Sequence, residues 1–203
     1  MKELKRVSRT YAETPARWLG RLGLTPNALT VIGSLLTASV GVLIAQGWFV
    51  AAGVCLWLFS ATDTLDGALA RATGRVTVFG AFLDSVSDRY AEAAVFFGIA
   101  WYYQATVNPR GVALTYLALV GSLMVSYARA RAEGVGLQAA EVGWFQRPER
   151  IVLLGVGLLL TPFFPIALEF VLAALAILTT ITVLQRVRHV ARASGYNHPH
   201  TTP

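Results

Sequence analysis

Residues 63–88 read DTLDGALARATGRVTVFGAFLDSVSD, and they contain all four aspartates of the chain, at positions 63, 66, 84 and 88. Long apolar runs precede and follow this stretch, so the aspartates lie within or beside segments that resemble the interior of membrane helices. A carboxylate at the centre of a bilayer costs about 3 kcal/mol even by the more generous scales. Four of them require a nearby cation, and one or two divalent metal ions would balance their charge most economically.

The composition around this stretch is that of an integral membrane protein. Hydrophobic residues make up 55% of the 203 residues and charged residues only 14%, whereas an average soluble domain is about 25% charged. Because a membrane-spanning helix needs about 20 residues, the chain has room for five or six spans and short loops. We therefore predict an all-α integral membrane fold in one compact bundle, with no separate soluble domain.

Six apolar segments are candidates for the spans. They cover about residues 27–46, 49–72, 80–103, 111–131, 150–163 and 166–187. Pro162 and Pro165 leave the last pair open, since they are compatible with a tight turn or with a kink in one long helix. Residues 1–24 mix basic side chains with aromatic residues and leucines, which indicates a juxtamembrane amphipathic helix, with a solvated basic tail as the alternative. We expect the six-helix membrane domain to cover residues 25–190 and a cytoplasmic tail to cover residues 191–203.

The basic residues indicate the orientation. With six spans, 15 of the 17 lysines and arginines fall on the same side of the membrane, and only Arg89 and Arg110 do not. By the positive-inside rule that side is cytoplasmic, so both termini and the aspartates face the cytoplasm in a multi-pass protein of the cell membrane. A five-span arrangement would put the C-terminal basic residues outside. The net charge of +6 fits anionic lipid headgroups better than nucleic acid, because the basic residues flank spans and do not alternate with exposed aromatics.

The spacing of the aspartates predicts that they lie together. Asp63 and Asp66 are three residues apart near the end of the second segment, and Asp84 and Asp88 are four apart near the start of the third, so each pair shares a helix face. The short connection, with Gly74 as a helix breaker, makes the two helices antiparallel neighbours. Four converging carboxylates without cysteine or histidine form a hard oxygen site, which suits Mg²⁺ or Mn²⁺. The alternative is that they only form ion pairs with nearby arginines, although stability alone rarely maintains so many intramembrane carboxylates.

The pattern Asp63-x2-Asp66-Gly67-x2-Ala70-Arg71-x8-Gly80-x3-Asp84-x3-Asp88 resembles the signature of the CDP-alcohol phosphotransferases at every position. The resemblance implies a six-helix membrane fold, usually a homodimer, in which an alcohol hydroxyl attacks the β-phosphorus of a CDP-linked lipid and expels CMP. It implies two Mg²⁺ ions, replaceable by Mn²⁺, with four ligands, Asp63, Asp66, Asp84 and Asp88, of which Asp88 is also the catalytic general base. The CDP-lipid contacts that it implies are Asn27, Thr30, Gly67, Arg71 and Thr77.

A second cluster of cations bears on the acceptor. Arginines lie at 129, 131, 147 and 150, between the fourth and fifth segments, and at 186, at the cytoplasmic end of the last one. An uncharged alcohol does not need such a cluster, whereas a phosphorylated acceptor gains bidentate hydrogen bonds from it. These segments, and Arg89 directly after Asp88, resemble the prokaryotic phosphatidylinositol phosphate and archaetidylinositol phosphate synthases, which use inositol 1-phosphate. That resemblance implies that Arg129, Arg150 and Arg186 hold the acceptor phosphate, although Arg129 stands where those enzymes often have lysine.

Other interpretations stay open on the sequence alone. Glycerol 3-phosphate is also a phosphorylated acceptor, but phosphatidylglycerophosphate synthases usually have lysine at the position of Arg89. A divalent-cation transporter would use the acidic cluster as its pathway, yet the second and third segments become apolar beyond Ser60 and Glu92. The lipid could be CDP-diacylglycerol or a CDP-linked ether lipid, and the dimer interface has no signature. Glu92 is expected either to support the site or to pair with Arg89, and Glu169 has no partner that the sequence identifies.

Overall fold

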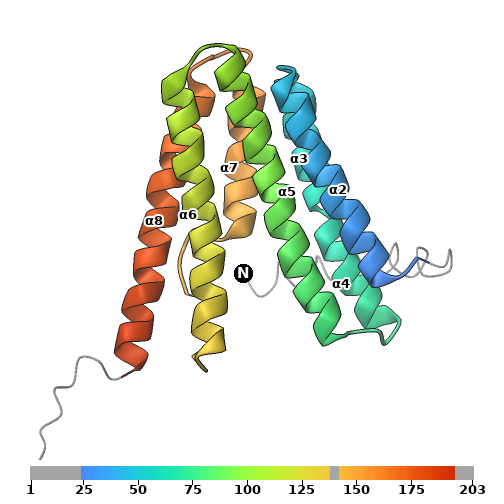
Figure 1. The fold of residues 1–203 in the computed structure, drawn as a ribbon. Coiled ribbons are helices and arrows are strands. Elements are labelled where there is room, and N and C mark those ends of the chain that lie inside the picture. The colour runs from blue at the N-terminus through green and yellow to red at the C-terminus, as the bar shows by residue number, and fades with distance from the viewer. Residues whose placement is uncertain (1–23, 138–141, 195–203) are drawn as a thin grey trace, which may run out of the picture. The chain divides into compact units, whose positions relative to one another are not determined.

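The structure, a computed structural model, describes residues 24–137 and 142–194, without the side chains of Asp63 and Thr64. Over these residues the chain is helical and contains no strand (Figure 1). The helices are α2 (Pro26–Ala45), α3 (Phe49–Ser60), α4 (Thr62–Ala72), α5 (Val78–Ala105), α6 (Pro109–Gly134), α7 (Arg147–Leu160) and α8 (Ala167–Ala193). The amphipathic helix expected in residues 1–24 and most of the expected tail fall outside the described part of the chain.

Within the described part of the chain, four helical stretches are long and apolar enough to cross a membrane. They are Pro26–Ala45, Phe49–Ala72, Pro109–Gly134 and Ala167–Ala193. The second consists of α3 and α4, which are separated by a break at Ala61. α5 is long enough, but any 18-residue window within it contains Asp88, Arg89 and Glu92, and α7 has only 14 residues. The prediction of an all-α membrane protein is confirmed in this form, whereas the number of six spans is still a prediction.

The local sequence explains where several helices begin and end. Thr25 Oγ1 accepts a hydrogen bond from the main-chain N–H of Ala28 at 3.2 Å, and Asn108 Oδ1 accepts one from that of Gly111 at 2.9 Å. A proline directly follows each capping residue, where its missing N–H would have no partner in the helix. The prolines at 162 and 165 lie in a turn between α7 and α8, which are two separate helices.

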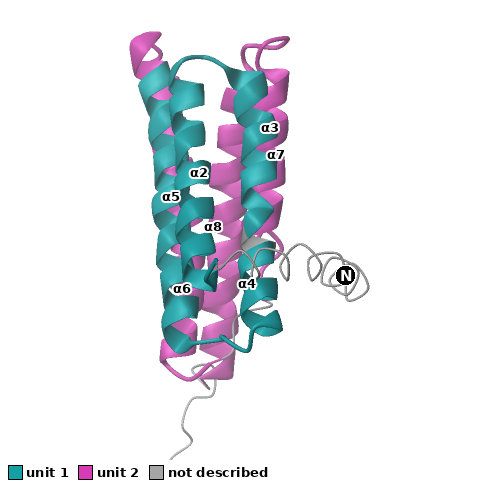
Figure 2. Cartoon of the chain, turned by 90° about the vertical axis from the view of Figure 1, so that its right-hand side faces the viewer, with its two compact units in different colours: residues 1–102 teal, residues 103–203 magenta. Residues whose placement is uncertain are grey.

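The chain divides into two compact units, Met1–Tyr102 and Tyr103–Pro203, which Figure 2 shows in teal and magenta. In the first unit α2 packs against α3 and α4. In the second unit α8 packs against α6 and α7, and Leu168, Leu172 and Leu175 on α8 are fully buried. The aspartates and the predicted acceptor arginines belong to different units.

Small residues bring the helices of the first unit into close contact. A Cβ on Gly41 in α2 would collide with the main-chain carbonyl of Ala94 in α5, and a Cβ on Gly98 would collide with the main chain of Gly41. Gly33 in α2 lies in the same way against the side chain of Thr62 at the start of α4. Close approach through small residues is typical of helix contacts in membranes. It fixes α2 against both of the helices that carry aspartates.

A polar contact joins two turns within the second unit. Asn108 Nδ2 donates a hydrogen bond to Glu169 Oε1 at 2.9 Å, and Arg110 Nε lies 3.2 Å from Glu169 Oε2. The Glu169 side chain is largely buried, and its charge is balanced by this arginine. Glu169, for which the sequence identified no partner, therefore holds the start of α8 against the start of α6.

Candidate active site

The aspartate pairs lie on two helices that are joined by a short turn (Figure 1). Asp63 and Asp66 are on α4, and Asp84 and Asp88 are on α5. Gly74, in the turn, has a φ of +65°, a left-handed conformation that glycine adopts without steric cost. The chain reverses direction there, so α4 and α5 run antiparallel, as the short connection between them predicted.

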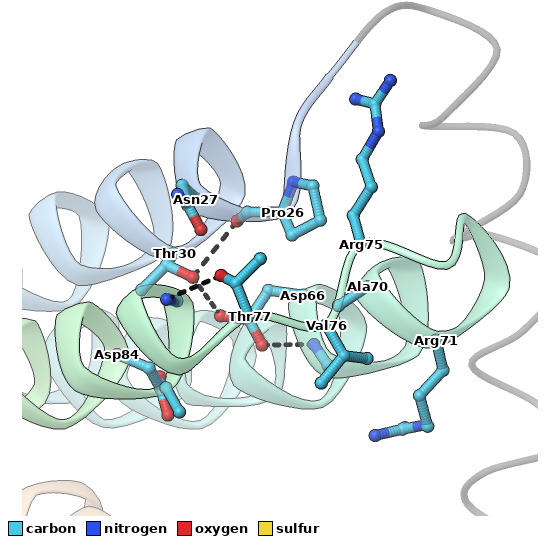
Figure 3. Close-up of a pocket in the computed structure, with 13 residues that line it drawn as sticks. Pro26, Asn27, Thr30, Asp66, Ala70, Arg71, Arg75, Val76, Thr77 and Asp84 are labelled. Atoms are coloured by element: carbon cyan, nitrogen blue, oxygen red, sulfur yellow. Dashed lines mark hydrogen bonds between the residues drawn. The ribbon is translucent and has the colours of Figure 1, made fainter.

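A cavity of about 310 Å³ lies between α2, α4 and the start of α5 (Figure 3). Two predicted metal ligands, Asp66 and Asp84, are among the residues that line it. All the predicted CDP-lipid contacts also line it, namely Asn27, Thr30, Gly67, Arg71 and Thr77. Asp88, the predicted general base, is not part of the lining of this cavity. Most of the site residues predicted in the first unit therefore line the same cavity.

Two glycines leave room for the polar wall of this cavity. A Cβ on Gly80 would lie 3.0 Å from Thr77 Oγ1 and 3.1 Å from Asn27 Oδ1, and a Cβ on Gly67 would lie 3.3 Å from Arg71 Nη1. The main-chain N–H of Gly80 also donates a hydrogen bond to Thr77 Oγ1 at 2.9 Å, which caps the start of α5. A methyl group at Gly80 would therefore crowd two short side chains of the cavity wall, whereas the end of the Arg71 side chain could move away from a methyl group at Gly67.

Asp66 is an oriented hydrogen-bond acceptor. It is only 7% exposed. The hydroxyl of Thr30 on α2 donates to Asp66 Oδ2 at 2.6 Å, and the main-chain N–H of Gly67 donates to Oδ1 at 2.5 Å. Hydrogen bonds to a carboxylate are short and stronger than those between neutral groups. Two donors on different oxygens thus restrict how this carboxylate can rotate.

Asp88 is equally buried, and its neighbours on α5 are charged. Arg89 Nη2 lies 3.3 Å from Asp88 Oδ2, and Arg89 Nε lies 3.6 Å from Glu92 Oε2. Of the two roles expected for Glu92, the structure shows the ion pair with Arg89. One arginine therefore lies between two carboxylates, which lowers the cost of keeping both of them in the helix.

The donor set of the site fits a hard divalent cation. The cavity lining offers carboxylate, hydroxyl and amide oxygens and neither thiolate nor imidazole, and oxygen ligands are those that Mg²⁺ and Mn²⁺ prefer. Among the described side chains, no three acidic, histidine or cysteine residues form a ready metal-binding group. The side chain of Asp63, one of the four predicted ligands, lies outside that set. The convergence of all four carboxylates is therefore still a prediction.

Two of the predicted acceptor arginines are buried in the second unit. Arg150, in the first turn of α7, and Arg186, on α8, are each 3% exposed. Arg186 Nε donates a hydrogen bond to the main-chain carbonyl of Val142 at 2.9 Å, and its Nη1 donates to that of Val125. The guanidinium thus joins α8 to α6 and to the loop before α7. Its position is set by main-chain atoms.

Arg129 differs from these two arginines. Its side chain is 49% exposed, and its Nε donates to Glu133 Oε1 on the same helix at 2.9 Å. Arg129 and Arg150 are nevertheless near enough to Arg186 to repel its positive charge. Three cations held close together are a favourable environment for an anion such as a phosphate.

Comparisons with known proteins identify relatives that match most of the chain. The model of the CDP-alcohol phosphatidyltransferase family matches residues 23–183. The phosphatidylinositol phosphate synthase of Mycobacterium tuberculosis is 40% identical over 201 residues, which cover 95% of this chain and 91% of that protein. The archaetidylinositol phosphate synthase of Pyrococcus horikoshii is 39% identical over 184 residues, which cover 91% and 88% of the two chains.

Solved structures show the same similarity. The crystal structure of the M. tuberculosis phosphatidylinositol phosphate synthase with CDP-DAG bound has a TM-score of 0.84 and 34% sequence identity to this chain, with 94% of this chain and 98% of that one covered. A second crystal structure of that enzyme, in complex with manganese and citrate, has a TM-score of 0.82 at 34% identity and covers 95% and 92% of the two chains. The chain therefore belongs to the CDP-alcohol phosphatidyltransferases, the family of membrane enzymes that its aspartate pattern resembles.

Proposed function

We propose that the protein transfers a phosphatidyl group from CDP-diacylglycerol to a hydroxyl of 1D-myo-inositol 3-phosphate, which is also called L-myo-inositol 1-phosphate. The products are phosphatidylinositol phosphate and CMP. The observation that carries this proposal is the cavity of about 310 Å³ that two motif aspartates share with Asn27, Gly67 and Arg71. The names of the relatives at about 40% identity agree with it.

In this proposal two Mg²⁺ ions, replaceable by Mn²⁺, bind to Asp63, Asp66, Asp84 and Asp88. Bound there, they would neutralise the pyrophosphate of the CDP-lipid and stabilise the departing CMP. The oxygen-only donor set of the cavity supports this assignment. The manganese in the M. tuberculosis enzyme is consistent with it.

In this proposal the side chains of the first unit also bind the CDP-lipid and accept the proton of the attacking hydroxyl. Asn27, Thr30, Gly67, Arg71 and Thr77 bind the CDP-lipid, with the guanidinium of Arg71 near an anionic oxygen. Asp88 takes the proton of the attacking hydroxyl while that oxygen forms a bond to the β-phosphorus and the bond from phosphorus to the bridging oxygen breaks. The bridging oxygen leaves with CMP, and no covalent enzyme intermediate is needed.

The arginines of the second unit hold the phosphate of the acceptor in this proposal. Arg150 and Arg186 are almost completely buried, and the described hydrogen bonds of Arg186 go to main-chain carbonyls, which leave its positive charge in place. Arg129 adds a third cation close to them. Glycerol 3-phosphate is the second candidate acceptor, because its phosphate would be attracted to the same arginines.

The location and topology of the protein are part of the proposal. We place six spans in the cell membrane, formed by α2, α3 with α4, and α5 to α8, within a membrane domain of residues 25–190. A juxtamembrane helix would precede it in residues 1–24, and a tail would follow in residues 191–203. The excess of basic residues at one side of this arrangement puts both termini and the active site in the cytoplasm.

We further propose that the protein is a homodimer that uses the outer face of α5. Phe79, Phe82, Tyr90, Phe97 and Trp101 recur at helical spacing on that face, and all are exposed. Tyr90 lies near the middle of the helix and is 77% exposed, where a hydroxyl facing lipid tails would have nothing to bind. A second copy would cover it. Native mass spectrometry in mild detergent should give a dimer, and Tyr90→Ala should increase the monomer fraction.

The test of the proposed reaction is CMP release by the purified protein in Mg²⁺ with CDP-diacylglycerol. Inositol 1-phosphate, glycerol 3-phosphate, serine and no acceptor are compared, with EDTA as the control for the metal. Turnover only with inositol 1-phosphate is the expected result. Turnover with another acceptor would support phosphatidyl transfer but show that inositol 1-phosphate is not the acceptor. Absence of CMP together with metal flux into liposomes would instead support the transporter.

The lipid substrate needs its own comparison. The M. tuberculosis and P. horikoshii relatives are almost equally similar to this chain, and their names imply different lipids. Initial rates with CDP-diacylglycerol and with a CDP-linked ether lipid, in the same detergent, would separate the two. We expect faster turnover with CDP-diacylglycerol, and a faster rate with the ether lipid would reassign the substrate.

A further inference from the structure

A hydrogen bond between two helices connects α2 to a predicted metal ligand. Thr30 is buried on α2, and its Oγ1 lies 2.6 Å from Asp66 Oδ2 on α4 and 3.1 Å from the main-chain oxygen of Pro26 (Figure 3). A hydroxyl has one proton to donate. The shorter distance and the charged acceptor assign this proton to Asp66, since O–H to carboxylate bonds are typically about 2.5–2.7 Å long.

The packing around this bond leaves Thr30 little freedom. Leu29, the preceding residue, forms a buried cluster with Ala68 and Leu69 on α4. One turn further along α2, Gly33 lies against Thr62 so closely that a Cβ would not fit. α2 is therefore held at a fixed distance from α4, and the Thr30 side chain is β-branched, which restricts its rotation further.

The second oxygen of Asp66 is restrained from within its own helix. The main-chain N–H of Gly67 donates to Oδ1 at 2.5 Å, while Thr30 holds Oδ2. A carboxylate with a donor on each oxygen has a defined plane, and each oxygen keeps a lone pair for a metal. Partners of this kind behind a ligand typically change metal affinity by about 10- to 100-fold when they are removed.

We propose that Thr30 is a positioning residue for Asp66: it orients this carboxylate toward a divalent cation, in addition to lining the cavity. The inference rests on the proposed function in that Asp66 is taken as a metal ligand. This role differs from CDP-lipid binding alone. Loss of a nucleotide contact would lower the affinity for the lipid substrate, whereas loss of a positioning residue lowers the affinity for the metal.

The experiment compares Thr30→Val, which keeps the shape and removes the hydroxyl, with Thr30→Ser, which keeps the hydroxyl. Thr37→Val is the matched control, since Thr37 is a buried threonine on the same helix that does not line the cavity. Mn²⁺ binding is measured by electron paramagnetic resonance in detergent, without lipid substrate. Michaelis constants for CDP-diacylglycerol are measured separately at saturating Mg²⁺.

Thr30→Val should raise the Kd for Mn²⁺ by about 10- to 100-fold, while Thr30→Ser and Thr37→Val should stay close to the unchanged protein. At saturating metal the KM for CDP-diacylglycerol should rise by a smaller factor than the Kd for Mn²⁺ does, because Thr30 also lines the cavity. An unchanged Kd for Mn²⁺ together with a raised KM for the lipid would overturn the inference in favour of a direct nucleotide contact.

Two further measurements keep the test decisive. If Thr30→Val melts below the assay temperature, Thr30→Cys replaces it, because a thiol is a weak donor of similar size; weakened Mn²⁺ binding supports the inference, and unweakened binding overturns it. If the unchanged protein binds Mn²⁺ but releases no CMP with any acceptor, the proposed function fails. The effect of Thr30→Val on Mn²⁺ binding then still decides the role of Thr30.

Discussion

Asp66 in the first unit and Arg186 in the second are both buried charged residues on membrane helices, but they are held in different ways. Asp66 accepts a hydrogen bond from a side chain on another helix, the hydroxyl of Thr30, in addition to the one from the main-chain N–H of Gly67. Arg186 donates to two main-chain carbonyls, those of Val125 and Val142. The hydrogen bond from Thr30 depends on the residue type at position 30, whereas the hydrogen bonds of Arg186 depend on the path of the backbone.

This difference determines what mutation can reveal. The hydrogen bond from Thr30 can be removed by one substitution that leaves the Asp66 carboxylate intact, so the orientation of this group can be changed without changing its charge. The carbonyls that hold Arg186 remain whatever side chain replaces Val125 or Val142. In the second unit only the arginine itself can be changed, and its charge and its geometry have to be separated by comparing lysine with alanine.

The largest effect on the reaction rate should come from a substitution at Asp88, in the first unit. Asp88→Asn removes the predicted base while it preserves the shape of the residue, and CMP release should fall by about 10²- to 10⁴-fold. The rate is measured at saturating Mg²⁺ and both substrates, with the melting temperature as the control for folding. Full turnover in a folded variant would show that another group takes the proton.

Arg186 should give the next largest effect. Arg186→Ala should raise the KM for inositol 1-phosphate by about 10- to 100-fold, which corresponds to about 1.5–3 kcal/mol for a hydrogen bond to a charged group. The KM for CDP-diacylglycerol should change far less. Arg186→Lys should recover only part of the loss, because an ammonium keeps the charge but cannot donate to both carbonyls and a phosphate with the geometry of a guanidinium.

Equal changes in the two Michaelis constants would mean that Arg186 supports the fold and does not recognise the acceptor. Arg150→Ala provides the comparison within the same unit, since Arg150 is just as buried. We expect the same pattern of Michaelis constants for it. A pattern shared by both variants would assign recognition to the cluster rather than to one residue.

The close packing of the first unit should have an intermediate effect, on stability. Gly98→Ala places a methyl group against the main chain of Gly41 and should cost about 1–3 kcal/mol, as overpacking commonly does. Gly134→Ala is the matched control, because a Cβ there meets nothing within 4 Å. Thermal melting in one detergent compares them, and equal melting temperatures would show that α2 and α5 can separate slightly without loss.

The smallest effect should come from Arg129. This arginine is half exposed and pairs with Glu133 on the same helix, and such exposed pairs contribute about 0.2–1 kcal/mol. Arg129→Ala should therefore leave the melting temperature almost unchanged and raise the acceptor KM less than Arg186→Ala does. A larger increase than that of Arg186→Ala would reverse the order of the two arginines at the acceptor phosphate.

The part of this molecule that depends on residue type could be predicted from the sequence. The apolar segments agree with the positions of the helices, and the family assignment from the aspartate pattern is confirmed. The family resemblance also predicts a role for Thr30, although only as a lipid contact. The sequence left Pro162 and Pro165 undecided, since proline suits a turn and a kink alike, and the structure has a turn there.

What depends on the path of the backbone could not be predicted. The carbonyls of Val125 and Val142 carry no signal in their side chains, because every residue has the same carbonyl group. The partners of Glu169 lie 61 and 59 positions away in the chain, at Asn108 and Arg110, and become neighbours only when two turns meet. The break at Ala61, between α3 and α4, falls among the polar residues Ser60, Thr62 and Asp63, with neither proline nor glycine within five positions.

The division of the chain into two units has a consequence for how the protein is made. The residues that line the cavity, from Pro26 to Asp84, all lie in the unit that ends at Tyr102. At a synthesis rate of about 5–20 residues per second, the ribosome needs about 5–20 s to complete the second half of the chain. The half that carries the aspartates is synthesised first, so it can begin to fold several seconds before the half that carries the predicted acceptor arginines is complete.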